Sequence, residues 1–184
     1  MPTYDTPRRG VSYSEALLEA AAVAPTHRAV LETFEIFQEV ATPDGAIYLV
    51  ANPVDFDGTK EATAERDPGD TVTFMAAPIS SDPVEESDSA EAPEMPVRLS
   101  NVSGLVSDAT RLARGSLEPW QLIQRLYASD DPTGPAMLPV LSLLVSKVRT
   151  TATEAALTAS YGDPSNVSIP ALKFRRAEYS TLVL

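Results

Sequence analysis

The chain contains no cysteine and only one histidine, His27, among its 184 residues. Without cysteine it has no disulfide, no thiolate nucleophile and no cysteine zinc site, so redox chemistry does not indicate a compartment and the fold depends on packing alone. A metal site or a Ser-His-Asp triad would depend on His27, yet the sequence offers no second histidine and no G-x-S-x-G motif. We interpret His27 as a surface or helix-end residue, and predict no catalytic, cofactor-binding or metal-binding residues.

Basic residues are also scarce, with 14 Lys and Arg against 26 Asp and Glu and a formal net charge of −12. This charge repels phosphate, and no segment collects enough basic residues to overcome it, so nucleic-acid and anionic-membrane binding are disfavoured. The longest apolar runs, around 138–145 and 20–24, fall short of the ~20 residues that span a bilayer. No apolar stretch follows Arg8 and Arg9, so we expect no signal peptide and no membrane insertion. The expected partners are proteins.

Hydrophobic residues make up 43% of the chain, which is ordinary for a globular protein. Residues 1–12 contain prolines and a glycine without periodicity, and are predicted to form an N-terminal arm that neighbours order. Residues 13–184 are predicted to form one β-rich domain. Ser12 and Glu15 have the spacing of a capping box and predict a helix over 13–24, which Pro25 ends. Helical spacing of apolar residues predicts a short second helix over 103–113.

Period-two alternation predicts most of the remaining structure. In residues 30–40, Phe34 and Ile36 fall on one face and Thr33 and Glu35 on the other, as in a half-buried strand. A turn at 43–45 and a strand at 46–51 complete a hairpin. Residues 120–128 fit both a helix and a strand, and we choose the strand. Further strands are predicted at 71–76, 97–100, 138–148 and 151–161. The fold class is mainly β, an antiparallel sandwich or barrel with two helices.

Four polar segments and two aromatic residues are candidates for a functional role. Residues 78–96 form an acidic stretch with few large apolar residues, Met95 among them, interpreted as a loop that is either a solvated connector or a docking surface. Asp55, Asp57 and Gly58 resemble the opening of a calcium loop but lack the later glutamate, and we interpret them as a turn. The glycosylation-like triplets 101–103 and 166–168 are attributed to chance. Trp120 and Tyr127 are candidate interface anchors or core residues.

Four segments together resemble the bacteriophage tail family known as domain of unknown function 1833. They are YSEALLEAAAVAP (Tyr13 to Pro25), TVTFMAAP (Thr71 to Pro78), RLSNVSGLV (Arg98 to Val106) leading into LIQRLYASDDPTGP (Leu122 to Pro135), and TASYGDPSNVSIPALKFRRAEYS (Thr158 to Ser180). More weakly, the chain resembles the N-terminal part of the minor tail protein L of lambda-like phages. It lacks the cysteine-bearing region that holds an iron–sulfur cluster in those hub proteins, so hub and distal-tail ring both stay open.

The resemblance implies a structural subunit of a phage tail tip rather than an enzyme. Such a subunit is made in the bacterial cytoplasm and resides in the virion. Its expected partners are identical subunits in a symmetric ring and neighbouring tail-tip, tail-tube and tape-measure proteins, contacted through the arm, the acidic loop and the apolar tail 169–184. The alternatives are a tail-associated cell-wall hydrolase and a monomeric phage-encoded binding module.

Overall fold

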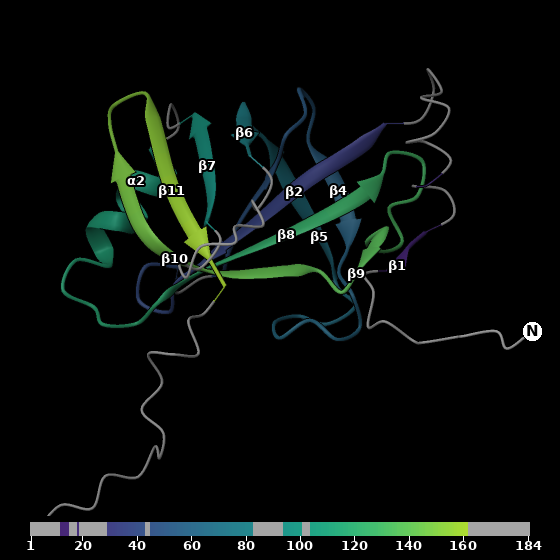
Figure 1. The fold of residues 1–184 in the computed structure, drawn as a ribbon, viewed down its shortest axis with the longest axis horizontal. Coiled ribbons are helices and arrows are strands. Elements are labelled where there is room, and N and C mark those ends of the chain that lie inside the picture. The colour runs from purple at the N-terminus through teal and green to yellow at the C-terminus, as the bar shows by residue number, and fades with distance from the viewer. Residues whose placement is uncertain are drawn as a thin grey trace, which may run out of the picture.

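The structure is a computed structural model that describes residues 12–14, 18, 29–42, 45–82, 94–100 and 104–161. This part of the chain is mainly β with one short helix, α2 (Leu105–Leu112) (Figure 1). Nine strands form one mixed sheet that is not closed, in the order β4-β5-β3-β2-β8-β10-β11-β7-β6. Their bounds are β2 Val30–Phe37, β3 Ile47–Val50, β4 Phe56–Thr59, β5 Thr71–Ala76, β6 Ile79–Ser81, β7 Glu94–Ser100, β8 Trp120–Ala128, β10 Leu141–Thr150 and β11 Glu154–Ser160. The short strands β1 (Ser12–Tyr13) and β9 (Met137–Leu138) pair separately.

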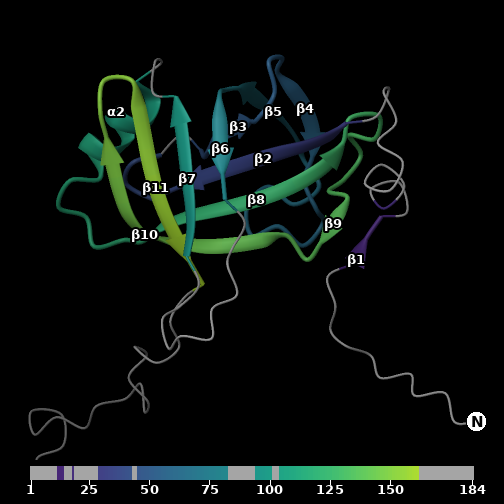
Figure 2. The same ribbon diagram turned by 45° about the horizontal axis from the view of Figure 1, so that its top comes forward.

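The sheet coils back on itself because one stretch of chain joins its two ends. β5 runs parallel to β3 near one end, and β6, two residues later, pairs with β7 at the other. Within that link, Ala77 N donates to Val50 O at 3.0 Å, and Pro78 O accepts from Ser100 N at 3.0 Å. Figure 2 shows β11, β7 and β6 passing in front of β2 and β8 at a steep angle. The predicted antiparallel sandwich or barrel is not confirmed, since the strands form a single open sheet that is mixed because of the parallel β3–β5 pair.

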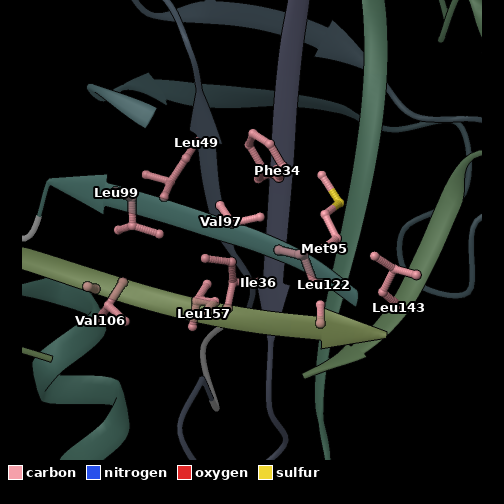
Figure 3. Close-up of a cluster of buried hydrophobic side chains, with 12 residues drawn as sticks. Phe34, Ile36, Leu49, Met95, Val97, Leu99, Val106, Leu122, Leu143 and Leu157 are labelled. Carbon is pink, nitrogen blue, oxygen red and sulfur yellow. The ribbon is translucent and has the colours of Figure 1, made fainter. Parts of the chain in front are cut away.

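The main hydrophobic core fills the inside of this coil (Figure 3). Phe34 and Ile36 of β2 and Leu122 of β8 meet Val97 of β7 and Leu157 of β11, all almost fully buried. These side chains come from alternating positions of their strands, the arrangement that places every second residue on the same face. α2 covers one end of the core with Val106, which is 2% exposed.

The opposite face of β2 and β8 is buried as well. The β4–β5 hairpin and the segment that joins its strands lie against it, and a second apolar cluster forms there. Thr33 and Glu35, predicted on a solvent-facing side, are 0% and 1% exposed. The prediction of a half-buried strand at 30–40 is therefore wrong, because a second layer covers the polar face.

Most predicted strands are confirmed with small changes in their ends. The hairpin of β2 and β3, the strand at 71–76, the strand at 120–128 and the helix α2 all occur. The predicted strand 30–40 ends earlier, at Phe37, because Gln38 begins a turn in which its carbonyl accepts from Thr42 N at 2.8 Å. β4 was missed in the polar segment 52–70, and β6 and the start of β7 occupy both ends of the predicted loop 78–96.

The N-terminal predictions are tested only in part. Tyr13, predicted to begin a helix, instead lies in β1 and pairs with Met137. Leu18 N donates to Ser14 O at 3.1 Å, the spacing of an α-helical bond. Residues 1–11 of the predicted arm, residues 15–17 and 19–24 of the predicted helix and the tail 169–184 lie outside the described residues. In the described part, no helix has the length and apolar character to span a bilayer.

Candidate functional site

A group of buried charges lies on the second face of β2 and β8, and we call it the ion network. Its centre is Glu35 of β2, which is 1% exposed. Oε1 of Glu35 accepts from Arg66 Nε at 3.1 Å and Nη2 at 2.9 Å, and its Oε2 accepts from Arg125 Nη1 at 2.7 Å. Arg125 also donates to both carboxylate oxygens of Glu61, at 2.7 and 2.9 Å. Such paired, charge-assisted bonds are the strong class of protein hydrogen bond.

Lys60 extends the ion network toward the surface. Its Nζ lies 3.9 Å from Glu35 Oε1 and 3.5 Å from Asp67 Oδ2, and it donates to the Tyr48 hydroxyl at 3.3 Å. The network thus contains three acidic and three basic side chains: Glu35, Glu61, Asp67, Lys60, Arg66 and Arg125. Burying one of these charges alone would cost several kcal/mol, on the order of the desolvation penalty of a single ion. The balance of opposite charges compensates this cost.

The environment raises the pKa of Arg125 and of Tyr48 at this face. Burial lowers the pKa of Arg125, but the hydrogen bonds that Arg125 donates to Glu61 and the charges of Glu35 and Glu61 outweigh it and raise the pKa overall, so the guanidinium stays charged. Burial, together with the negative charges of Glu35 and Asp67, raises the pKa of Tyr48 to about 12. Both side chains therefore keep one protonation state through the neutral range. The arrangement holds segment 60–70 on the sheet.

An aromatic cluster continues this face beside the ion network. Tyr127 is fully buried, its hydroxyl donates to Thr59 O at 2.9 Å, and its ring lies 5.2 Å from that of Phe56 and 5.8 Å from that of Phe74. Gly58 passes directly over this ring, where a Cβ would approach Tyr127 to 3.2 Å and Phe56 to 2.7 Å. Of the two readings for Tyr127, the structure thus supports the core residue.

The remaining residues singled out from the sequence do not assemble into one site. Trp120 is partly buried and packs against the main core. Asp57 accepts from the Thr73 hydroxyl at 2.6 Å and Asp55 from Ala76 N at 2.7 Å, so both brace the β4–β5 hairpin. His27 and the triplets 101–103 and 166–168 lie outside the described residues. Within the described ranges, no group of three or more His, Cys, Asp or Glu could hold a metal ion.

The sequence reasoning missed the ion network, although a signal was present. In β8, Arg125 alternates with Ile123 and Tyr127 on one face, and an arginine between two apolar neighbours on the same face indicates a buried charge. A buried arginine requires a carboxylate partner. Glu35, which lies among Phe34, Ile36 and Phe37 in the neighbouring strand, is the residue that this reasoning would select.

An apolar cavity of about 330 Å³ opens at the end of the coil, where the link between β5 and β6 passes α2. It is lined mainly by apolar side chains of β3, β5, β7 and α2, among them Leu49, Met75, Leu99 and Leu105. Its size is at the lower end of the range for small-molecule pockets. Nothing in the lining carries a charge, so the cavity suits an apolar occupant.

Next to this cavity, leucines gather on the outer surface of α2. Leu105 and Leu112 are seven residues apart and therefore share one helix face, 40% and 57% exposed. Leu117, in the turn after the helix, is 100% exposed. The neighbouring Ser116 hydroxyl accepts from Gln38 Nε2 at 2.9 Å, which brings the turn containing Val40 alongside. We call the surface formed by Val40, Leu105, Leu112 and Leu117 the α2 patch.

These features define a class of protein: a coiled, single-sheet β domain, rigidified by a buried ion network, with an apolar surface at the end covered by a short helix. The family model described as "Domain of unknown function (DUF1833)" matches residues 16–174, and the chain belongs to that family. The segments in the sequence that carried the resemblance to this family all overlap the matched region. No curated protein matches the chain.

Proposed function

We propose that the protein is a structural subunit of the tail tip of a long-tailed bacteriophage, in the hub or the distal-tail ring, and that it acts by protein–protein assembly. The α2 patch is the observation that carries this proposal. Leu105 and Leu112 are exposed on one face of α2, and the wholly exposed Leu117 follows Leu112 by five residues. Exposed apolar residues gathered in one region mark interaction sites in soluble proteins. Membership of the family supports the assignment, through the resemblance to phage tail proteins.

The ion network supports the same proposal through rigidity. It fixes segment 60–70 to β2 and β8 with ion pairs from three basic side chains. A subunit that binds the same neighbours in every particle gains affinity from such pre-organisation, because little ordering is left to occur on binding. Identical subunits in a symmetric ring and adjacent tail-tip, tail-tube and tape-measure proteins are the proposed partners, and the virion is the proposed location.

The test is the mass of the purified protein, alone and mixed with neighbouring tail proteins, by light scattering and sedimentation. We expect it to join a larger assembly, and a double variant Leu112→Ser/Leu117→Ser to stay outside it. Val54→Ser is the matched control, because Val54 is 66% exposed but lies in a loop distant in sequence from α2. A protein that remains a monomer with every neighbour and is absent from phage tails would contradict the proposal.

The apolar cavity favours a second candidate, a monomeric binding module. Its uncharged lining and volume of about 330 Å³ could hold one apolar side chain or a small apolar ligand. The two functions differ in one measurement. A binding module binds its ligand as a monomer, whereas a tail subunit buries the α2 patch against other subunits.

A further inference from the structure

From a second surface, we infer that a cationic groove on the outer face of β10, β11 and β7 binds the acidic segment 82–94 of a second copy of this chain. This inference rests on the proposed function and names one of its subunit contacts. The groove has a volume of about 200 Å³. Arg98, Lys147 and Arg149 line it, and Ala156 and Thr158 form its floor.

Strand register explains how the groove is built. Arg149 of β10 lies opposite Ala156 of β11, which lies opposite Arg98 of β7, so two arginines flank one alanine. One step along the same face, Lys147 lies opposite Thr158. Small residues on the central strand and long basic residues on its neighbours leave a trough along β11. An extended segment can lie in this trough with basic side chains on both sides.

The basic side chains of the groove lack acidic partners in the described part of the chain. There, Lys60, Arg66, Arg111 and Arg125 form ion pairs, and of the other four basic residues, all but Arg114 line this groove. The acidic residues of the three strands, Glu94 and Glu154, form no ion pair with them among the described residues. Three neighbouring cations without an acidic partner among the residues that the structure describes are unusual in a chain of net charge −12. Opposite charges at such a surface determine partner and register.

The chain itself supplies a segment of matching chemistry. Residues 82–94 contain six carboxylates and no lysine or arginine: Asp82, Glu85, Glu86, Asp88, Glu91 and Glu94. Because the groove and the acidic segment are different surfaces, pairing one with the other between copies is a head-to-tail contact. A head-to-tail contact generates a closed ring when its rotation closes, which is the assembly that the proposed function requires.

The experiment exchanges charges between the two surfaces. One variant, R98E/R149E, reverses the groove, and the other, E85K/E86K, reverses part of the segment. In sedimentation velocity, we expect the dissociation constant for self-association of each variant alone to be at least about tenfold higher than that of the parent chain, a loss of about 1.4 kcal/mol. We expect an equimolar mixture of the two to recover association, because the reversed groove then meets a reversed segment. E65K/D70K, with the same change in net charge as E85K/E86K at exposed residues outside the groove, the acidic segment and the α2 patch, is the matched control and should associate like the parent.

Several results would overturn the inference. They are association that survives groove reversal, equal losses in E85K/E86K and the E65K/D70K control, a mixture that fails to recover, or a parent chain that stays monomeric because the segment occupies its own groove. Binding of a nucleic acid by the groove in place of the acidic segment would overturn it too. If groove reversal has no effect while Leu112→Ser/Leu117→Ser still prevents assembly, this inference fails and the proposed function stands.

Discussion

The two faces of strands β2 and β8 are both buried, but by opposite means. One face carries Phe34, Ile36 and Leu122 into an apolar core, and the other carries Glu35 and Arg125 into the ion network. The apolar face is stabilised by removal of surface from water, a non-directional effect. The ion network depends on exact partners, because each buried charge costs free energy unless an opposite charge and hydrogen bonds compensate it.

The difference shows how a polar strand face becomes internal. Lys60, Glu61 and Arg66 of segment 60–70 form ion pairs with Glu35 and Arg125 of the sheet. The charges of the covering segment therefore compensate the charges of the strand face that it covers. The Arg66 guanidinium also stacks on the Phe37 ring, with Cζ 3.6 Å from the ring centre. The apolar face tolerates exchange among hydrophobic residues, whereas the ion network should not tolerate loss of any central member.

Arg125→Met is expected to have the largest effect, because it removes a central member of the ion network. This change leaves Glu35 and Glu61 buried with fewer partners, and we expect a loss of about 3–5 kcal/mol in the free energy of unfolding, as for a buried ion pair with one partner removed. Denaturant unfolding followed by circular dichroism measures it. Arg111→Met is the control, since Arg111 pairs with Asp108 on the exposed surface of α2 and should change stability little. Equal effects of the two substitutions would show that the ion network does not stabilise the fold.

Leu122→Ala tests the apolar face of the same strand. Leu122 is 0% exposed, so the substitution leaves a cavity in the main core and should cost about 2–5 kcal/mol. Here the fully exposed Leu117→Ala serves as the control, with stability expected to stay near that of the parent. For Leu122→Met we expect the free energy of unfolding to fall by less than about 1.5 kcal/mol, because a core accepts another apolar side chain of similar volume.

Gly58→Ala probes the contact between the covering layer and the sheet. The added methyl group would lie 2.7 Å from a Phe56 ring carbon and 3.2 Å from the Tyr127 ring, so the aromatic cluster must shift. We expect a cost of about 1–3 kcal/mol, as for overpacking of a core. Thermal unfolding measures it, and Gly134→Ala, where no atom lies within 4 Å of the new methyl, is the control. A double variant Gly58→Ala/Phe56→Leu that recovers stability would locate the clash at Phe56.

The sequence allows the strands to be predicted better than the arrangement that connects them. Alternation around Phe34 and Ile36 and around Ala155, Leu157 and Ala159 reports local periodicity, and β2 and β11 follow it. The coil of the sheet depends on Ala77 and Pro78 bonding to strands distant in sequence, which no local pattern encodes. The alternation around Arg125 does indicate a buried charge, but the partners Glu61 and Arg66 come from a segment distant in sequence that no local pattern connects to it.

The smallest expected effect is a pH dependence confined to the ion-network face. Because the pKa of Tyr48 is raised from 10.0 to about 12, the neutral phenol is favoured in the folded state. The unfolded chain then loses this proton first, so the stabilisation is complete below pH 10 and falls as the pH rises toward about 12. Burial raises the pKa of Tyr127 in the same direction.

Unfolding free energies measured from below pH 10 to about pH 12 should therefore decline less steeply in Tyr48→Phe than in the parent chain. Leu122→Ala provides the contrast, since it removes only apolar contacts and should lower stability by the same amount at every pH. If the free energy of unfolding falls with pH in parallel for Tyr48→Phe and the parent, alkaline sensitivity arises outside the ion-network face. If Leu122→Ala changes the slope of the free energy of unfolding against pH, the two faces are coupled more tightly than their separate clusters indicate.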